Sequence, residues 1–485
     1  RDGRNGLGTI IVFGAGNERQ LGGNTNYNLE AHSQLAITVG AINETGDLGA
    51  LVISQAPFSN PGASILVSAP GTNVTSTSRL IENDEGSVFG SDFNAVQGTS
   101  FAAPIVSGVV ALMLQANPNL GYRDVQDILA LSAKKIIDTN TTWTDNHAVN
   151  WNGGGMHVSN DYGFGEVDAL AAVRLAESWT YQNTIANLYG PTPGSVTLNQ
   201  AIPDGSGMLT SSINAGGGYL IEHAAVTVNL THQQAGDLII KLISPSGTES
   251  VLVNRPGKVP GSGATDRGDI TFGGSNQLDY TFETVDNWGE LSGGNWQLQV
   301  SDAASGATGT LTSWELTLYG RLEGDDNYVY TNDYAVIGTG SRATLNDIND
   351  GLDTLNAAAV GGNSIINLNS GTTSTLAGNT LTIGAATIIE NAFSGDGNDT
   401  LTGNTADNRL AGGRANDVIT GDAGNDILEG DRGNDTLTGG TGADLFVINK
   451  DAGSSDTITD FDVTRERIAL VGFGSSASFA DLTLT

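Results

Sequence analysis

Short apolar runs alternate with longer, helix-like apolar patterns in residues 1–178. The runs at 9–13 and 35–41 predict buried strands, because short continuous apolar runs bounded by turn residues are typical of strands inside a sheet. Residues 101–115 and 123–134 have the length and apolar content of helices. Strands that alternate with helices in this way predict an α/β fold for this part of the chain.

The pattern changes between residues 182 and 320, where short β-rich runs are separated by Gly, Ser, Pro and Asp. The clearest runs are 225–230, 238–243 and 296–300. Several short strands divided by turn residues are the pattern of an all-β sandwich, and we expect that fold here.

From about residue 321 the chain is rich in Gly, Asn, Asp and Thr, and residues 394–447 repeat with a period of nine. An apolar eighth residue predicts a narrow core, and the glycines permit tight turns in which the backbone approaches an ion. The eighth position holds Leu401, Leu410, Ile419, Leu428, Leu437 and Phe446, and the first holds Ser394, Gly403, Gly412, Gly421, Gly430 and Gly439. A disordered linker is the alternative, but disorder would not require an apolar residue at every eighth position.

The sixth position of each repeat supplies a candidate metal ligand, because carboxylate oxygens are the hard ligands that Ca²⁺ prefers. This position reads Asp399, Asn408, Asp417, Asp426, Asp435 and Asp444. The pattern resembles the RTX repeats, a family that forms a parallel β-roll in which two nonapeptides make one full turn.

The RTX resemblance implies which residues share a calcium ion. Ligand pairs lie two repeats apart, so Asp399 is paired with Asp417, Asp417 with Asp435, and Asp426 with Asp444. Asn408 replaces an aspartate, and the site that it shares with Asp426 is expected to be weaker. Glycines of the repeats complete the sites with backbone oxygens, and those assigned are Gly397, Gly412, Gly421, Gly424, Gly430 and Gly433.

The flanks of the repeats extend the likeness. Residues 391–393 and 455–462 resemble the C-terminal domain of serralysin-type secreted proteases, and the resemblance covers roughly residues 350–485. It implies calcium-triggered folding, export by a type I secretion apparatus and an extracellular location. Asp456 and Asp460 are candidate further ligands, with surface turn residues as the alternative.

Charge and cysteine content narrow the possible partners. The chain carries 53 acidic and 20 basic residues, for a formal net charge of −33, so nucleic acid and anionic membranes are not expected partners. Cysteine is absent, which excludes disulfides and thiolate zinc sites and leaves calcium as a candidate stabiliser. No run of 18 apolar residues occurs, so no membrane span is predicted. We interpret Arg1 and Thr485 as cuts in a longer protein.

Residues 97–104, Gln-Gly-Thr-Ser-Phe-Ala-Ala-Pro, form the most specific motif. A nucleophilic serine needs a tight turn that exposes its Oγ and a helix start that favours negative charge. Gly98 provides the turn, Ser100 lies at the predicted helix start, and Pro104 is expected in the first helical turn. A simple helix N-cap is the alternative, because Ser and Thr are favoured at that position.

This motif resembles the serine box of the subtilases and matches it fully. Residues 12–17, Val-Phe-Gly-Ala-Gly-Asn, resemble the subtilase strand that ends in the oxyanion asparagine. The resemblance implies that Ser100 is the nucleophile of an acyl-enzyme mechanism. It also implies that the Asn17 amide and the Ser100 backbone N–H stabilise the oxyanion.

The rest of the catalytic triad is expected upstream of this chain. In subtilases the Asp and His lie about 190 and 157 residues before the serine, which places both before residue 1. None of the five histidines lies in a His-Gly-Thr setting, and we expect them at the surface: His32, His147, His157, His223 and His232. The chain alone is therefore predicted to be inactive.

Two further sets of segments narrow the family to the kexin branch. Those similar to kexins are 117–120, 123–126, 131–133, 162–165 and 167–169. Those similar to the P domain of proprotein convertases, a jelly-roll sandwich, are 243–248, 287–290, 294–296 and 314–320. We expect Trp288, Trp296 and Trp314 in the core of this sandwich.

The resemblance does not predict cleavage after basic residues. Kexins use acidic side chains in the P1 pocket, and one of these acids lies eleven residues after the oxyanion asparagine. Asn28 occupies that place here, and Asn60 stands near the position of a calcium-binding glutamate.

These observations predict part of a secreted, calcium-dependent serine endopeptidase that acts on proteins or peptides. The expected domains are a partial subtilisin-like α/β domain (1–180), a β-sandwich P domain (181–320) and a β-roll (321–485). An RTX adhesin with a degenerate protease module is the alternative, and a carbohydrate-binding role for the sandwich is another.

Overall fold

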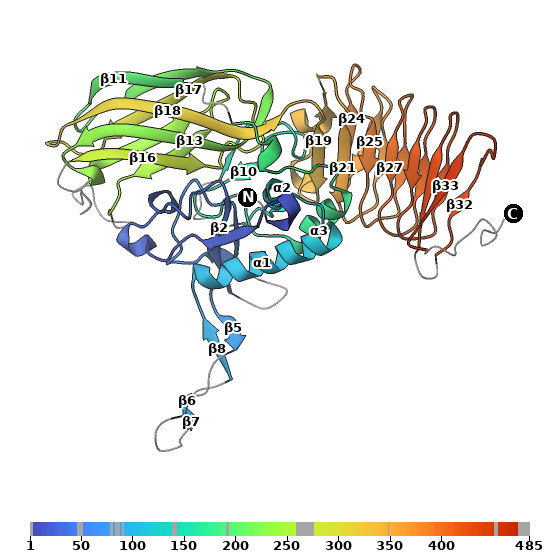
Figure 1. Ribbon diagram of the computed structural model, residues 1–485, viewed down its shortest axis with the longest axis horizontal. Helices are drawn as coiled ribbons and strands as arrows, with labels where there is room; N and C mark the ends of the chain where they lie inside the picture. The colour runs from blue at the N-terminus through green and yellow to red at the C-terminus, as the bar shows by residue number, and fades with distance from the viewer. Residues whose placement is uncertain are drawn as a thin grey trace. The chain divides into compact units, whose positions relative to one another are not determined.

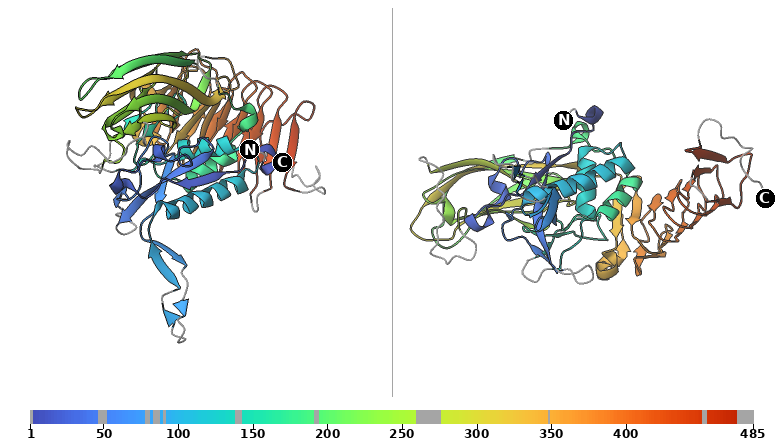
Figure 2. Two further views of the ribbon diagram at one scale, coloured as in Figure 1. Left: turned by 60° about the vertical axis from the view of Figure 1, so that its left-hand side comes forward. Right: turned by 90° about the horizontal axis from the view of Figure 1, so that it is seen from below.

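The computed structural model describes residues 3–45, 52–77, 81–82, 88–89, 92–137, 143–190, 194–258, 276–347, 349–450 and 454–473. The chain divides into two compact units (Figures 1 and 2). The first consists of Arg1–Ala148, Met156–Ala169 and Thr180–Leu322, and the second of Val149–Gly155, Leu170–Trp179 and Glu323–Thr485.

The first unit begins with a four-stranded sheet and its helices (Figure 1). Its strands are β1 (Ile11–Gly14), β2 (Ala36–Thr45), β3 (Val52–Gln55) and β4 (Val67–Pro70). Strand β2 pairs in parallel with β1 and β4 and antiparallel with β3. The helices are α1 (Thr99–Ala116) and α2 (Tyr122–Ser132), and α1 packs against β1, β2 and β4. A short antiparallel pair is formed by β9 (Thr144–Asp145) and β10 (His157–Val158). The predicted α/β arrangement is confirmed.

Two local expectations for this region are wrong. The run 9–13 was predicted to be a buried strand, but Ile11 is 47% and Phe13 36% exposed. Both side chains share one face of β1, which no described element fully covers. Pro104 lies beyond the first turn, because α1 already begins at Thr99.

A hairpin projects from the sheet just before α1 (Figures 1 and 2). It consists of β5 (Val74–Thr77) paired with β8 (Phe93–Val96), and β6 (Ile81–Glu82) paired with β7 (Val88–Phe89). Strand β8 leads directly into Gly98 and the start of α1, so the hairpin connects to the segment that carries Ser100.

Two antiparallel four-stranded sheets complete the first unit, with the orders β11-β18-β13-β16 and β12-β17-β14-β15. Their strands are β11 (Gly194–Ile202), β12 (Leu209–Ala215), β13 (Tyr219–His232), β14 (Leu238–Ile243), β15 (Glu249–Asn254), β16 (Gln277–Thr284), β17 (Gly294–Asp302) and β18 (Gly309–Leu322). Alternate residues of β14 are buried, as expected for a strand with one face on a core. One apolar core contains side chains from both sheets, and the three strand runs predicted from the sequence lie in β13, β14 and β17.

A buried ion pair links α2 to β13 within this unit. The Arg123 guanidinium donates to both carboxylate oxygens of Glu222, at 2.7 and 2.6 Å. It also donates to the carbonyls of Thr184 (3.1 Å) and Gly320 (2.8 Å). The side chains of the pair are only 2% and 5% exposed, so the charges are compensated inside the protein and not by water.

All three tryptophans of the sandwich region are buried, but only Trp296 and Trp314 belong to its core cluster. Trp288 instead packs against Phe164 and His223 and donates its indole N–H to the Asp127 carboxylate at 2.8 Å. It therefore lies where the α/β part and the sandwich meet within the first unit.

The expectation of surface histidines is wrong for four of the five. His32, His157, His223 and His232 are each at most 5% exposed. The first three lie against aromatic rings, and His232 lies 3.2 Å from the Asp302 carboxylate. An imidazole can be buried in this way when ring contacts or hydrogen bonds replace water.

The second unit is built mainly from two sheets, with the orders β19-β21-β25-β27-β29-β31-β33 and β20-β24-β23-β22-β26-β28-β30-β32. Neighbouring strands are parallel, except that β23 pairs antiparallel with β22 and β24. Before the repeats lie α3 (Ala169–Ser178), β19 (Asn327–Thr331), α4 (Tyr334–Ile337), β20 (Thr344–Leu345), β21 (Thr354–Ala359), β22 (Ile365–Asn367), β23 (Thr373–Leu376), β24 (Asn379–Ile383) and β25 (Asn391–Phe393). The repeats and the following segment form β26 (Thr400–Thr402), β27 (Arg409–Ala411), β28 (Val418–Thr420), β29 (Ile427–Glu429), β30 (Thr436–Thr438), β31 (Leu445–Asn449), β32 (Thr457–Ile458) and β33 (Arg467–Val471).

Successive repeats alternate between the two sheets, and parallel neighbours are two repeats apart, as in Leu401 opposite Ile419. All six eighth-position side chains are 0% exposed and share one core. The predicted parallel roll with two nonapeptides per turn is confirmed.

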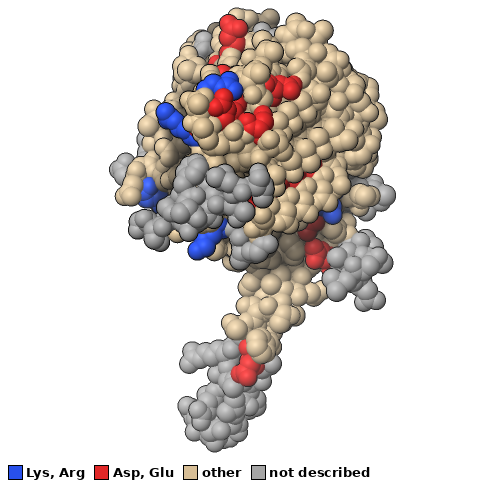
Figure 3. Space-filling model, turned by 90° about the vertical axis from the view of Figure 1, so that its right-hand side faces the viewer, with Lys and Arg blue, Asp and Glu red and all other residues tan. Residues whose placement is uncertain are grey.

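Helix α1 has the length and mean hydropathy, 1.6, of a membrane-spanning helix, whereas the sequence pattern predicted none. Core helices of soluble proteins meet the same criteria, and α1 packs on the sheet of the first unit. On the face shown in Figure 3, the described Lys and Arg side chains are scattered and form no continuous basic patch.

Candidate active site and metal centres

Ser100 is exposed at the N-terminus of α1, where the sequence motif places it. Gly98 precedes the helix with φ of +142°, a backbone conformation that side-chain-bearing residues rarely adopt. As the second residue of the helix, Ser100 has a backbone N–H without an intrahelical acceptor, and this end of the helix favours negative charge. A developing anion near Ser100 would thus meet a backbone donor.

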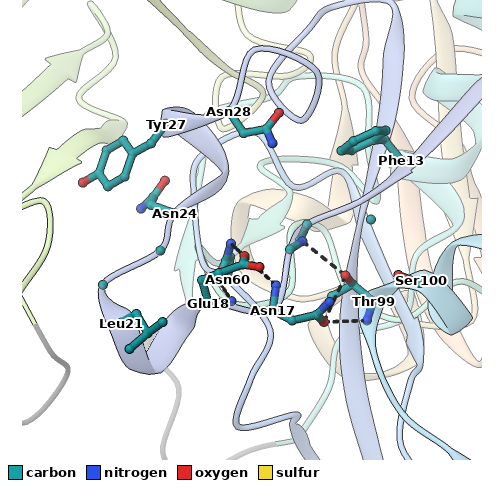
Figure 4. Close-up of a pocket in the computed structure, with 15 residues that line it drawn as sticks. Phe13, Asn17, Glu18, Leu21, Asn24, Tyr27, Asn28, Asn60, Thr99 and Ser100 are labelled. Carbon is teal, nitrogen blue, oxygen red and sulfur yellow. Dashed lines mark hydrogen bonds between the residues drawn. The ribbon is translucent and has the colours of Figure 1, made fainter.

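The Asn17 amide has a defined orientation beside this helix start (Figure 4). Its Oδ1 accepts a hydrogen bond from the Thr99 backbone N–H at 2.9 Å and from Thr99 Oγ1 at 3.3 Å. A backbone N–H can only donate, so the amide oxygen must face Thr99 and Nδ2 must point elsewhere. Nδ2 has no hydrogen-bond partner among the described residues, which leaves it available to donate.

Asn17 and Ser100 line the same pocket, which has a volume of about 610 Å³. Asn28 and Asn60, both singled out in the sequence, also line it. The full lining is Phe13, Gly14, Ala15, Gly16, Asn17, Glu18, Leu21, Gly22, Gly23, Asn24, Tyr27, Asn28, Asn60, Thr99 and Ser100.

Glu18 is the one acid in this lining, and sequence reasoning missed it (Figure 4). Its Oε2 accepts hydrogen bonds from the Asn17 backbone N–H (2.8 Å) and Asn60 Nδ2 (3.0 Å), and Asn60 Oδ1 accepts from the Glu18 N–H (2.8 Å). The network holds the backbone on either side of Asn17 and places a negative charge in the pocket. Its only sequence signal is that Glu18 directly follows Asn17.

The sixth-position residues form a hydrogen-bonded ladder along each edge of the roll. The backbone N–H of Asp399 donates to Asp417 Oδ1 at 2.7 Å, and that of Asp417 donates to Asp435 Oδ1 at 2.8 Å. On the other edge, Asn408 donates to Asp426 (2.8 Å) and Asp426 to Asp444 (2.9 Å) in the same way. The structure thus brings together the pairs inferred from the sequence.

The second carboxylate oxygens of this ladder suit a cation. Oδ2 of Asp417, Asp426 and Asp444 is buried without a hydrogen-bond partner among the described residues. Burial, reinforced by neighbouring carboxylates, raises the pKa of Asp417 to about 8 and that of Asp426 to about 7. A cation would favour the ionised forms, and hard oxygens of this kind are calcium ligands.

The predicted glycines lie at these oxygens in different ways. A Cβ on Gly412, Gly421 or Gly430 would collide with Oδ2 of the sixth-position aspartate of its own repeat. Only glycine therefore keeps that space open for an ion. A Cβ on Gly424 or Gly433 would instead collide with the carbonyl oxygen of the repeat one turn earlier, whereas Gly397 contacts the backbone of Asn363 and no ladder carboxylate.

The first turn of the roll differs from the later ones. Both oxygens of Asp399 accept backbone hydrogen bonds, from Ser364 and from Gly395. Asn408 accepts from the Asn404 N–H and donates its Nδ2 to the Glu390 carbonyl. Hydrogen bonds thus occupy the oxygens that later repeats leave open.

The two acids after the repeats both accept backbone hydrogen bonds from the roll, but only Asp456 extends a sixth-position ladder. Asp456 Oδ1 accepts from the Asp435 N–H at 3.2 Å and so extends one ladder. Asp460 accepts from the N–H groups of Gly439 (2.9 Å) and Gly440 (2.8 Å).

A further acidic group was not predicted. Carboxylate oxygens of Asp326, Asp347 and Asp353 lie within 4.8 Å of one another. Burial and the charges of Asp347, Asp326 and Glu390 raise the pKa of Asp353 to about 7. Asn349 Oδ1 is buried nearby without a partner among the described residues, and Asn349 Nδ2 donates to Asp326. This set of oxygens fits a divalent cation.

Three parts of the chain match known families. Residues 1–165 match the subtilase family, 221–318 the proprotein convertase P-domain, and 344–483 the peptidase M10 serralysin C-terminal family.

The relatives and solved structures that resemble the chain support the same assignment. It is 34% identical over 336 residues to proprotein convertase subtilisin/kexin type 7 of Homo sapiens, covering 66% of this chain and 38% of that protein. It is 31% identical over 344 residues to kexin of Saccharomyces cerevisiae, covering 68% and 38%. The chain thus spans well under half the length of these relatives. A serine protease of Aeromonas sobria shares the fold, with a TM-score of 0.54, 22% identity and coverage of 65% and 66%.

Proposed function

The chain belongs to the subtilisin/kexin-like proteases, with a proprotein convertase P-domain and a serralysin-type C-terminal segment. From that premise we propose that it forms part of a secreted, calcium-dependent serine endopeptidase. The supporting observation is the geometry at Ser100. An exposed serine starts a helix, and the amide of Asn17 is oriented so that its Nδ2 is free to donate into the same pocket.

In the proposed reaction Ser100 Oγ attacks the carbonyl carbon of the scissile peptide bond while a general base removes its proton. The carbonyl oxygen becomes an oxyanion, which the Ser100 N–H and Asn17 Nδ2 stabilise by donating hydrogen bonds. Collapse of the intermediate breaks the C–N bond, the amine leaves with the proton, and water then hydrolyses the acyl-enzyme by the same steps.

The general base and its orienting carboxylate are proposed to lie outside this chain. Four of the five histidines are buried away from the pocket, and His147 Nδ1 lies 3.0 Å from Thr248 Oγ1. None of the five lines the pocket that contains Ser100. The chain by itself is therefore expected to be inactive, because the oxyanion donors alone give only residual catalysis.

The substrates are proposed to be proteins or peptides. The pocket next to Ser100 has the apolar side chains of Phe13 and Leu21 and the single carboxylate of Glu18. Because Glu18 is exposed and charged, it would favour a cationic side chain near the scissile bond, although Asn28 and Asn60 supply no charge.

Calcium is the proposed cofactor of the roll, held by the sixth-position residues, the glycines of the repeats, Asp456 and Asp460. Bound Ca²⁺ would neutralise the buried carboxylates and so stabilise the folded roll. The Asp326–Asp347–Asp353 group is a further candidate calcium site. Export through a type I secretion apparatus and the domain boundaries 1–180, 181–320 and 321–485 complete the proposal.

The test uses the full-length protein and a fluorophosphonate, which forms a covalent bond with an activated serine. We expect labelling at Ser100 that is lost in Ser100→Ala and retained in the control Ser107→Ala. Ser107 is an exposed serine on the same helix whose Oγ donates to the Ala103 carbonyl. Labelling that persists in Ser100→Ala would contradict the proposed nucleophile.

A further inference from the structure

The backbone that carries Asn17 is held by side chains and not by the sheet. The Ala15 N–H still donates to the Val39 carbonyl at 2.9 Å, which continues the pairing of β1 with β2. Each of the next three N–H groups donates to a side chain instead: Gly16 to Thr99 Oγ1 (3.2 Å), Asn17 to Glu18 Oε2 (2.8 Å) and Glu18 to Asn60 Oδ1 (2.8 Å). The position of Asn17 therefore depends on these side chains.

Asn60 fixes the Glu18 carboxylate that accepts from Asn17 (Figure 4). Asn60 Nδ2 donates to Glu18 Oε2 at 3.0 Å, and the Asn60 backbone N–H donates to the Gly16 carbonyl at 3.0 Å. Asn60 is only 6% exposed, and both polar atoms of its side chain bond Glu18. One oxygen of an otherwise exposed carboxylate is thus held in a defined place.

Two glycines keep the space that this pair of side chains occupies. A Cβ on Gly16 would collide with Asn60 Nδ2 and Glu18 Oε2, and a Cβ on Gly23 would collide with Asn60 Oδ1 and Glu18 Cβ. Gly16 also has φ of +98°, a conformation that side-chain-bearing residues rarely adopt. The backbone on both sides of Glu18 is therefore shaped around the contact between Glu18 and Asn60.

The hydrogen bond of Glu18, and not its charge, suits the proposed reaction. The Glu18 side chain lines the pocket of Ser100, where an oxyanion would develop, and like charges repel each other. Its bond to the Asn17 N–H instead places the residue that supplies the oxyanion donor. Such a donor must lie about 2.7–3.1 Å from the oxyanion, and a displacement of about 1 Å can cost about 100-fold in rate.

We propose that Glu18 is a positioning residue for the reaction at Ser100. Its carboxylate oxygen fixes the backbone of Asn17, while Thr99 fixes the oxygen of the Asn17 amide, so that Nδ2 is placed for the oxyanion. Asn60 supports Glu18 in this role. The inference rests on the proposed roles of Ser100 and Asn17, and it is separate from any attraction of Glu18 for a cationic substrate.

The test measures how fast an uncharged alkyl fluorophosphonate labels Ser100 in the full-length protein, as a maximal rate constant and a half-saturating concentration. In Glu18→Asp the shorter side chain cannot reach both the Asn17 N–H and Asn60 Nδ2. We therefore expect the maximal rate constant to fall roughly 10- to 100-fold with little change in the half-saturating concentration. The matched control Glu315→Asp, at an exposed position on β18, should leave both values unchanged.

Glu18→Gln separates the hydrogen bond from the charge. Glutamine keeps an acceptor oxygen on a side chain of the same length, so this variant should keep at least about a third of the maximal rate constant. The opposite pattern, a fast Glu18→Asp and a slow Glu18→Gln, would show that the charge is what matters and would overturn the proposal.

The Asn17→Ala background shows whether Glu18 acts through Asn17. Adding Glu18→Asp to Asn17→Ala should lower the rate constant by less than about threefold, because the amide to be positioned is already absent. A further loss of about tenfold or more would overturn the proposal, since independent effects multiply.

The outcomes separate this inference from the proposed function. Labelling that is absent from the unmodified full-length protein, or that persists in Ser100→Ala, contradicts both. An unchanged rate constant in Glu18→Asp contradicts only the role of Glu18. Tryptophan fluorescence checks that each variant is folded, and if Glu18→Asp is not, Glu18→Ala replaces it with the same expected loss.

Discussion

Removing Glu222 should strongly destabilise the first unit, because it leaves the Arg123 guanidinium buried without the carboxylate that is hydrogen-bonded to it. The pair has two hydrogen bonds of 2.6–2.7 Å and side chains at most 5% exposed. Breaking such a pair by removing one partner costs about 3–5 kcal/mol. In a domain of this size that corresponds to a fall in Tm of roughly 6–20 °C for Glu222→Ala.

The double variant Arg123→Met/Glu222→Leu tests the cause. It removes both charges and fills the space with apolar groups, so beyond the pair itself the hydrogen bonds to the carbonyls of Thr184 and Gly320 and to Asn187 Oδ1 are lost. A buried pair replaced in this way is often nearly neutral in stability. We therefore expect the double variant to be at least about 2 kcal/mol more stable than Glu222→Ala.

Urea unfolding followed by tryptophan fluorescence measures these differences, because Trp296 and Trp314 lie in the sandwich core. The exposed pair Lys241–Glu249 provides a control, and Glu249→Ala should cost less than about 1 kcal/mol. A double variant as unstable as Glu222→Ala would refute the reasoning, since lost packing and not an unpaired charge would then explain the effect.

Three further predictions concern catalysis, calcium and pH. In the full-length protein, Asn17→Ala should lower kcat roughly 100- to 1000-fold with little change in KM, and a change confined to KM would remove Asn17 from the oxyanion site. Circular dichroism should show β structure lost with EDTA and regained with Ca²⁺ but poorly with Mg²⁺, and Asp426→Ala should weaken the response more than Asn408→Ala. Burial raises the pKa of Asp286 to about 8. The contribution of protonated Asp286 to the free energy of unfolding is thus fully present below pH about 4 and is lost as the pH rises through about 8. The free energy of unfolding falls by up to ~1.4 kcal/mol per pH unit over this range. Asp286→Asn should remove this pH dependence in urea unfolding between pH 5 and 8, and an unchanged slope would contradict it.

The sequence predicted the periodic parts of the structure well. The run 238–243 coincides with β14, and each eighth position of the repeats is buried, because burial on one face imposes a regular apolar pattern. The serine motif placed Ser100 at a helix start for a similar reason. A tight turn, an N-terminal hydroxyl residue and small side chains are all local requirements.

Features that depend on distant residues could not be predicted. The environment of His32 depends on Tyr280, which is remote in the sequence, so no local sequence pattern predicts that His32 is buried. The acidic group of Asp326, Asp347 and Asp353 has no regular spacing, and folding alone brings its oxygens together. Glu18 was missed because its role depends on the hydrogen bond with Asn60.

Because consecutive nonapeptides belong to opposite sheets, the roll has a parity. Deleting one nonapeptide would move every later strand to the other sheet. Sixth-position residues that now belong to different edges of the roll would then lie next to one another. Deleting two would remove one complete turn and leave the remaining ladders intact. Evolution can thus lengthen or shorten this roll by whole turns of two nonapeptides more easily than by single nonapeptides, although the single nonapeptide is the unit that repeats in the sequence.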